Sequence, residues 1–318
     1  MRRTAARLNG PERTTDAAPR NLTDRLPGDG PRARPVMSPV RKPAARPAPR
    51  GGRPVLLAVA HGSRDPAGTA ATRALLARVR ALRPELDVRC CFLDLAAPSL
   101  PTALGELSAG EPAVLVPLLL GTGYHLRVDI PGALADAGPP HVRLAPALGP
   151  SPLLAAALAD RLAESGRPAG AGPVVLAAAG SSDPDAAADT VRTARLLARR
   201  LGEGRPVVPA YLSAARPTPQ EAVEALHAAG HRDVAVATYL LGPGFFADRA
   251  AGTAARWASA PLGTHDALAR LVADRYDRAC RPALPGRADH ADQADQADQA
   301  DHDNRAAVPR REEAAVLR

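Results

Sequence analysis

The sequence predicts an α/β fold built as two similar lobes, each a doubly wound parallel sheet. Continuous apolar runs of strand length alternate with segments of helical spacing, which is typical of parallel sheets covered by helices. The chain is 46% hydrophobic but only 3% aromatic, so Ala, Leu and Val must build its core. The segment Gly-Ser-x-Asp-Pro occurs at 62–66 and again at 180–184. A repeat of this length predicts two domains of one fold rather than a solenoid.

The first copy opens with a strand and a helix. Residues 54–60 form a continuous apolar run, as expected of a parallel strand buried on both faces. Asp65 and Pro66 are typical of a helix start, with an acid at the N-cap and a proline in the first turn. Helical spacing follows over 69–83, and 87–93 is the second expected strand.

The rest of the first copy continues this alternation. Pro98 and Ser99 open a helix that we expect to run to about 109, and a third strand follows at 112–120. We expect a fourth strand at 141–146 and a closing helix at 151–164. The second copy has the same order of elements, and right-handed crossovers follow from this topology.

Composition divides the chain into four parts. We expect a disordered Pro- and Arg-rich tail over 1–52, an N-terminal lobe that carries the site over 53–168, a degenerate C-terminal lobe over 169–282, and a disordered low-complexity tail over 283–318. Residues 1–53 hold 13 basic and four acidic residues. Their net charge of 13 − 4 = +9 exceeds the net charge of +8 of the whole chain. Because the basic charge belongs to the tail, we expect no nucleic-acid partner for the lobes.

Several classes of protein are excluded by what the sequence lacks. Its three cysteines, Cys90, Cys91 and Cys280, form no CxxC or zinc spacing, which fits a reducing cytoplasm. No apolar run approaches the ~20 residues of a membrane span, and the N-terminus has no apolar signal region. Neither GxGxxG nor Walker A motifs occur, so no nucleotide cofactor is indicated. We therefore expect a cytoplasmic protein with no membrane partner.

Three side chains that can bind metal follow three different strands. His61 comes directly after the first strand, Asp94 ends the second, and His125 comes just after the third. Ligands of doubly wound sheets bind outside the carboxyl ends of the strands, where these side chains should gather. Imidazole and carboxylate suit Fe²⁺ or Co²⁺, and imidazole also accepts protons near neutral pH. His61, His125 and Asp94 are therefore the candidate catalytic and metal-ligating residues.

The second copy lacks all three of these candidates, although its glycines and flanking strands persist. The repeat aligns them with Ala179, Ser213 and Phe246. If the three side chains served the fold, the second copy should need them too. The comparison predicts one working site in the first lobe and a second lobe that has lost it.

Four more residues near these strand ends are candidates for binding a substrate. Arg64 and Arg127 could pair with carboxylates of an anionic substrate, and a solvated surface role is equally compatible with their positions. Ser63 and Thr122 are weaker candidates for hydrogen bonds to a substrate. All four follow the same strands as the two histidines.

Two segments resemble the signatures of a known family. Ala-His-Gly-Ser-Arg-Asp-Pro at 60–66 and Pro-Leu-Leu-Leu-Gly-Thr-Gly-Tyr-His-Leu-Arg-Val-Asp-Ile-Pro at 117–131 resemble those of the CbiX/SirB sirohydrochlorin chelatases, in their long, two-lobed form. The resemblance covers about 54–280 and implies the class II chelatase fold, with a cleft between two lobes. It implies that His61 and His125 are the metal-binding catalytic histidines. Asp94 matches a position where the family commonly carries Glu.

The resemblance also implies a reaction. A lyase-type chelatase would convert sirohydrochlorin and a divalent metal ion into metallo-sirohydrochlorin and two protons. We favour Fe²⁺, which gives sirohaem, and Co²⁺ insertion for cobalamin biosynthesis is the alternative. No cofactor is implied beyond the substrate metal, and a monomer could suffice because both lobes lie in one chain. Two non-enzymatic alternatives remain: a tetrapyrrole or metal carrier, and a plain two-domain scaffold.

Overall fold

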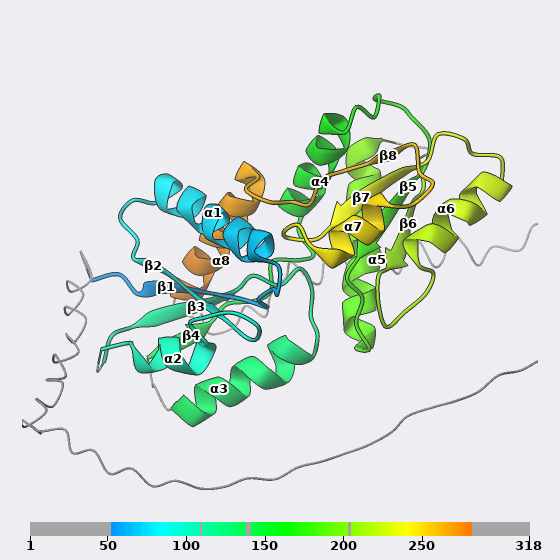
Figure 1. Ribbon diagram of the computed structural model, residues 1–318. Helices are drawn as coiled ribbons and strands as arrows, with labels where there is room; N and C mark the ends of the chain where they lie inside the picture. Colours follow the sequence, from blue (N-terminus) through cyan, green and yellow to red (C-terminus); the bar gives the residue numbers. More distant parts are fainter. Residues whose placement is uncertain (1–51, 109, 138–140, 203–204, 282–318) are drawn as a thin grey trace, which may run out of the picture. The chain divides into compact units, whose positions relative to one another are not determined.

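The computed structural model describes residues 52–281 apart from 109, 138–140 and 203–204 (Figure 1). Apart from Gly52, both tails expected to be disordered lie outside the described residues. No helix in the described part of the chain is long and apolar enough to cross a membrane.

The described chain contains two four-stranded parallel sheets of the same topology. Their strand orders are β2-β1-β3-β4 and β6-β5-β7-β8. The strands are β1 Val55–Ala60, β2 Val88–Phe92, β3 Ala113–Pro117, β4 Val142–Leu144, β5 Val174–Ala178, β6 Val207–Tyr211, β7 Ala235–Tyr239 and β8 Trp257–Ala258. In each sheet the first strand of the repeat pairs with the second and the third strands. The predicted pair of doubly wound lobes is confirmed.

Helices connect the strands, and the helical segment between β3 and β4 was not among the expected elements. They are α1 Pro66–Leu82, α2 Leu100–Gly105, η1 His125–Asp129 (a single π-helical turn), α3 Ile130–Ala137, α4 Pro152–Glu164, α5 Pro184–Leu201, α6 Pro219–Ala228, α7 Phe245–Ala251 and α8 Asp266–Cys280. Helix α2 ends earlier than the expected residue 109, since its last residue is Gly105. The expected fourth strand and closing helix are present as β4 and α4.

The Gly-Ser-x-Asp-Pro segment starts a helix in both lobes. Asp65 is the N-cap of α1 and accepts a hydrogen bond from the Ala67 amide at 2.8 Å, and Asp183 caps α5 in the same way. Ser63 and Ser181 each accept a hydrogen bond from the amide two residues later. Because amides at a helix start lack partners inside the helix, these caps stabilise the first turn.

One glycine of this segment is required by a close approach of two loops. Gly62 has φ +98°, and a Cβ there would lie 1.8 Å from the Asp94 carbonyl oxygen. Gly180 has φ +90°, and its Cβ would lie 2.0 Å from the Ser213 carbonyl oxygen. A side chain fits neither position. The equivalent contacts confirm that Asp94 and Ser213 occupy matching places in the two lobes.

The last helix of each repeat contacts the sheet of the other repeat. Helix α4 packs against α5 and β7, whereas α8 at the end of the described chain packs against α1, β3 and β4 (Figure 1). Arg78 and Arg83 of the α1 region pair with Asp266 and Asp277 of α8. The two halves are thus joined by exchanged helices. The division of the chain at residue 168 stays a prediction.

Tyr276 ties α8 to the start of β1. Its side chain is 1% exposed and its hydroxyl donates to the Pro54 carbonyl at 2.6 Å. We expect Tyr276→Phe to lower the free energy of unfolding by about 1 kcal/mol, because the carbonyl loses its partner. Tyr276→Ala should cost about 3–5 kcal/mol, because it also leaves a cavity. Urea denaturation of both variants checks this, and wild-type stability of Tyr276→Phe would refute the assigned hydrogen bond.

Candidate active site

The structure brings His61 and His125 together. His61 follows β1 and His125 opens η1 after β3, and β1 and β3 are paired parallel neighbours. The two imidazole centroids are 4.6 Å apart and the rings meet edge to face at 86°. His61 is exposed, and the His125 side chain is 37% exposed, so a ligand can reach both rings from solvent.

Asp129 orients His125, and our sequence reasoning missed it. The Nδ1 atom of His125 lies 2.5 Å from Oδ2 of Asp129, one turn later in η1. A carboxylate on Nδ1 favours the tautomer that leaves Nε2 free to bind metal. The signal in the sequence is the spacing of four residues in a helical segment, which places two side chains on one face.

Asp94 is not brought into a three-ligand group with the histidines. Its exposed carboxylate accepts a hydrogen bond from the Leu95 amide at 2.7 Å, and its own amide donates to the His61 carbonyl at 2.9 Å. Within the described ranges, no three His, Cys, Asp or Glu side chains are arranged to hold a metal ion. The structure therefore supplies a pair of imidazoles, and the acid's part in metal binding stays a proposal.

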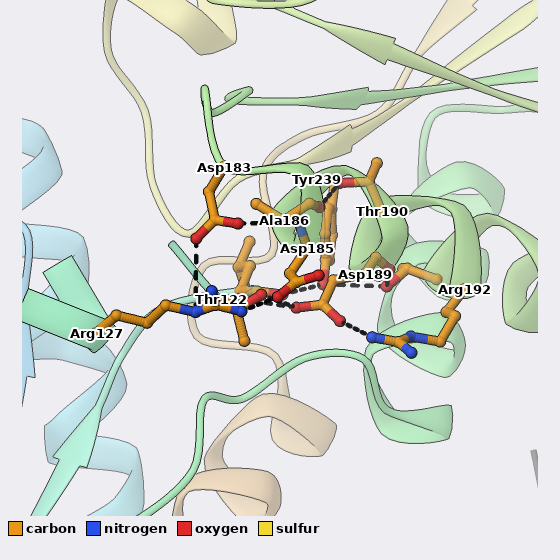
Figure 2. Close-up of polar contacts among 11 residues, drawn as sticks. Thr122, Arg127, Asp183, Asp185, Ala186, Asp189, Thr190, Arg192 and Tyr239 are labelled. Carbon is orange, nitrogen blue, oxygen red and sulfur yellow. Dashed lines mark hydrogen bonds and ion pairs between the residues drawn. The ribbon is translucent and has the colours of Figure 1, made fainter. Parts of the chain in front are cut away.

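Three of the four expected substrate-binding residues make bonds within the protein. Ser63 accepts the Asp65 amide, an interaction that Ser181 repeats in the second lobe. Thr122 donates from its amide and its hydroxyl to Asp189 of α5, at 2.8 Å in both cases (Figure 2). Arg127 pairs with carboxylates at the start of α5. Arg64 is exposed.

The loop that carries His125 is held on both sides by the second lobe. Arg127 pairs with Asp185 and lies 3.6 Å from Asp183, as Figure 2 shows. On the other side of the histidine, the Tyr239 hydroxyl donates to the Leu120 carbonyl at 2.6 Å. Burial raises the pKa of Tyr239 above its ordinary value, so this hydroxyl stays protonated and donates at physiological pH.

Large apolar side chains lie exposed beside the histidines. Tyr124 is 63% exposed and its ring centroid is 6.4 Å from that of His125, while Val128 follows in the same turn with 47% exposure. Leu95, next to Asp94, is 45% exposed. Exposed large apolar groups that gather beside a polar site often form a ligand surface.

Comparison with solved structures identifies the fold as chelatase-like. One neighbour is SirB from Bacillus subtilis with Fe³⁺, with a TM-score of 0.61, 24% identity, and coverage of 72% of this chain and 96% of that chain. Another is the structure of CbiX, described as the terminal enzyme for biosynthesis of siroheme in denitrifying bacteria. It has a TM-score of 0.53 and 22% identity, and covers 72% of this chain and all of that one. The class II chelatase-like fold is confirmed.

The chain belongs to the CbiX family. The family model matches residues 55–165 and again 173–279, which together are more than half of the chain. The two matches coincide with the two copies of the internal repeat. The expected family resemblance is thereby confirmed over both lobes.

Two relatives differ in the metal that their names state. The sirohydrochlorin cobaltochelatase of Priestia megaterium is 28% identical over 205 residues, which are 61% of this chain and 66% of that protein. The sirohydrochlorin ferrochelatase of Bacillus subtilis is 30% identical over 193 residues, 58% of this chain and 72% of that protein.

We predict that removing the Asp129 carboxylate weakens metal binding at the histidine pair. Asp129→Ala should lower the affinity for Co²⁺ about 10–100-fold, because His125 loses the partner that sets its ring orientation. Asp129→Asn should lose less, since its side-chain oxygen can still accept from Nδ1–H. Calorimetric titration with Co²⁺ measures both. The control is Asp136→Ala, which replaces an exposed acid in the following helix α3. Equal affinities in all variants would refute the role of Asp129 in orienting His125.

Proposed function

We propose that this chain inserts a divalent metal ion into sirohydrochlorin. The observation that carries the proposal is the pair of solvent-accessible imidazoles at the carboxyl edge of the first sheet. Membership of the CbiX family and the names of the two relatives support it. The reaction consumes sirohydrochlorin and M²⁺ and releases metallo-sirohydrochlorin and two protons.

In this mechanism His61 and His125 hold the metal ion before it enters the macrocycle. Two protein ligands leave most coordination positions to water, and such open sites permit exchange. The Asp129 carboxylate keeps the Nε2 face of His125 available. Because no closed shell of protein ligands has to open, the metal ion can pass from two imidazoles to four pyrrole nitrogens.

Two pyrrole protons must leave as the metal enters. Imidazole near neutral pH, or a water molecule on the metal, is a suitable acceptor. Asp94 has an assisting role in the proposal, because it follows β2 beside the same strand β1 and its carboxylate is exposed. Its Oδ1 atom accepts the Leu95 amide, and a carboxylate has a second oxygen that can bind a metal ion.

The macrocycle would lie against the exposed apolar side chains beside the histidines. Tyr124 and Val128 offer a surface for the ring, and the exposed guanidinium of Arg64 can attract its acidic substituents. Ser63, Thr122 and Arg127, also expected to bind substrate, have a supporting part in the proposal because their side chains bond within the protein.

The proposal names Fe²⁺ as the favoured metal and Co²⁺ as the alternative. Imidazole and carboxylate ligands suit both ions, and the two relatives divide between them. It also includes action by a single chain, since both lobes are present in it. A cytoplasmic location is part of the proposal too, since Cys90, Cys91 and Cys280 are free thiols.

Anaerobic absorbance spectroscopy tests the proposal. Purified protein is mixed with sirohydrochlorin and either Fe²⁺ or Co²⁺, and conversion of the free-base spectrum is followed over many turnovers. We expect His61→Ala and His125→Ala each to slow conversion about 10²–10⁴-fold, because each removes a metal ligand and possible base. The control is His231→Ala, which replaces an exposed histidine of the second lobe and should retain the full rate.

Two outcomes would contradict this function. Conversion no faster than with metal alone, together with stoichiometric binding of sirohydrochlorin, would indicate a carrier instead of an enzyme. Catalysis that survives in both histidine variants would show that the metal enters elsewhere. The ratio of the rates with the two metals decides between iron and cobalt.

A further inference from the structure

A buried carboxylate of the second lobe bonds the loop that carries His125. Asp189 lies in α5 and is 2% exposed. Its Oδ2 atom accepts both the amide and the hydroxyl of Thr122 at 2.8 Å, three residues before His125 (Figure 2). Its Oδ1 atom accepts from Arg192 at 2.5 Å. The loop also approaches closely, since a Cβ on Gly121 would lie 3.4 Å from this carboxylate.

Burying a carboxylate is costly unless it is hydrogen-bonded or paired. Asp189 is therefore held in place by the groups that it bonds, and it holds Thr122 in turn. Charge-assisted hydrogen bonds such as these are about twice as strong as neutral ones. The result is a fixed point on the loop just before the catalytic histidine.

The internal repeat provides a control for this contact. In the second copy the matching loop is Gly242-Pro243-Gly244, and it approaches α1 of the first lobe as the first loop approaches α5. A Cβ on Gly242 would lie 3.1 Å from the side chain of Ala71, the residue that matches Asp189. Proline has no amide hydrogen to donate. The acid is thus present where the loop has donors and absent where it has none.

The asymmetry follows the catalytic residues. The loop with Thr122 leads to His125, whereas the loop with Pro243 leads to Phe246. Both copies retain the same fold and the same glycines, so the fold alone does not require the acid. Two further bonds from the second lobe, Tyr239 to Leu120 and Asp185 to Arg127, hold the same segment on either side.

We propose that the second lobe positions the catalytic loop, with Asp189 as the positioning residue that fixes His125 against His61. The proposal rests on the proposed function in treating these histidines as metal ligands. It explains why a lobe that lacks the counterparts of His61 and His125 is retained: its α5 carboxylates supply the anchors for the loop. Asp189 acts through Thr122 and touches neither the metal nor the macrocycle.

The test measures Co²⁺ binding to the purified full chain, without sirohydrochlorin, by calorimetry and by the visible spectrum of the bound ion. Asp189→Ala should weaken binding about tenfold or more, the range found for residues that orient metal ligands. Thr122→Val, which removes the hydroxyl donor and keeps the amide, should weaken it less. Tyr276→Phe is the control, because it destabilises the fold away from the loop and should leave affinity unchanged.

A double variant separates positioning from stability. Asp189→Ala with Thr122→Pro copies the pairing of the second lobe, leaving neither an unpaired amide nor an unpaired acid. We expect it to unfold at a higher urea concentration than Asp189→Ala alone, while its Co²⁺ affinity stays low. Full recovery of affinity together with stability would overturn the positioning role, and so would wild-type affinity in folded Asp189→Ala.

Failure of the proposed function would be recognised separately. If the wild-type chain binds Co²⁺ through His61 and His125 but does not accelerate insertion, the chelatase assignment fails while the affinities still decide the role of Asp189. If Asp189→Ala does not fold, Thr122→Val tests the positioning role instead. Unchanged Co²⁺ affinity in that variant contradicts the proposal.

Discussion

The parallel pairing of β1 with β3 is the constraint on which the site depends. Val55 pairs with Ala113 and Val59 with Pro117, so both strands end at the same edge of the sheet. Neighbouring strands lie about 4.8 Å apart, and the imidazole centroids that follow them are 4.6 Å apart. A shift of one strand by one residue would turn its side chains to the other face and separate the histidines.

Each lobe has its own sheet of this topology, and the two sheets differ in the polar groups at their edges. In the first lobe, the loops after β1 and β3 carry imidazoles. In the second lobe, α5 carries carboxylates that bond the first lobe's loop, Asp189 to Thr122 and Asp185 to Arg127. The exchanged helices α4 and α8 join the halves. Under the proposed function, the first copy binds the metal ion and the second supports the loop that carries His125.

Much of the fold and part of the site were predictable because their signals are local. Apolar runs mark β1 and β3, and Asp65 with Pro66 marks the start of α1. The meeting of His61 and His125 followed from the parallel topology, since the carboxyl ends of neighbouring strands share an edge. Asp94 satisfied the same rule without joining the pair, because its carboxylate turns to the adjacent Leu95 amide. The position of a residue at the carboxyl end of a strand predicts that it lies near the site, but it does not predict the direction in which its side chain points.

The sequence by itself determined the two lobes, the family and the two histidines, because strand periodicity, a repeated segment and residues at strand ends are all written along the chain. Tertiary structure decided which of the candidate side chains bond within the protein. Ser63, Thr122 and Arg127 looked available in sequence, yet each bonds a group within the fold. Thr122 and Asp189 lie far apart along the chain. Their contact forms when two lobes pack together, and neither repeat contains it alone.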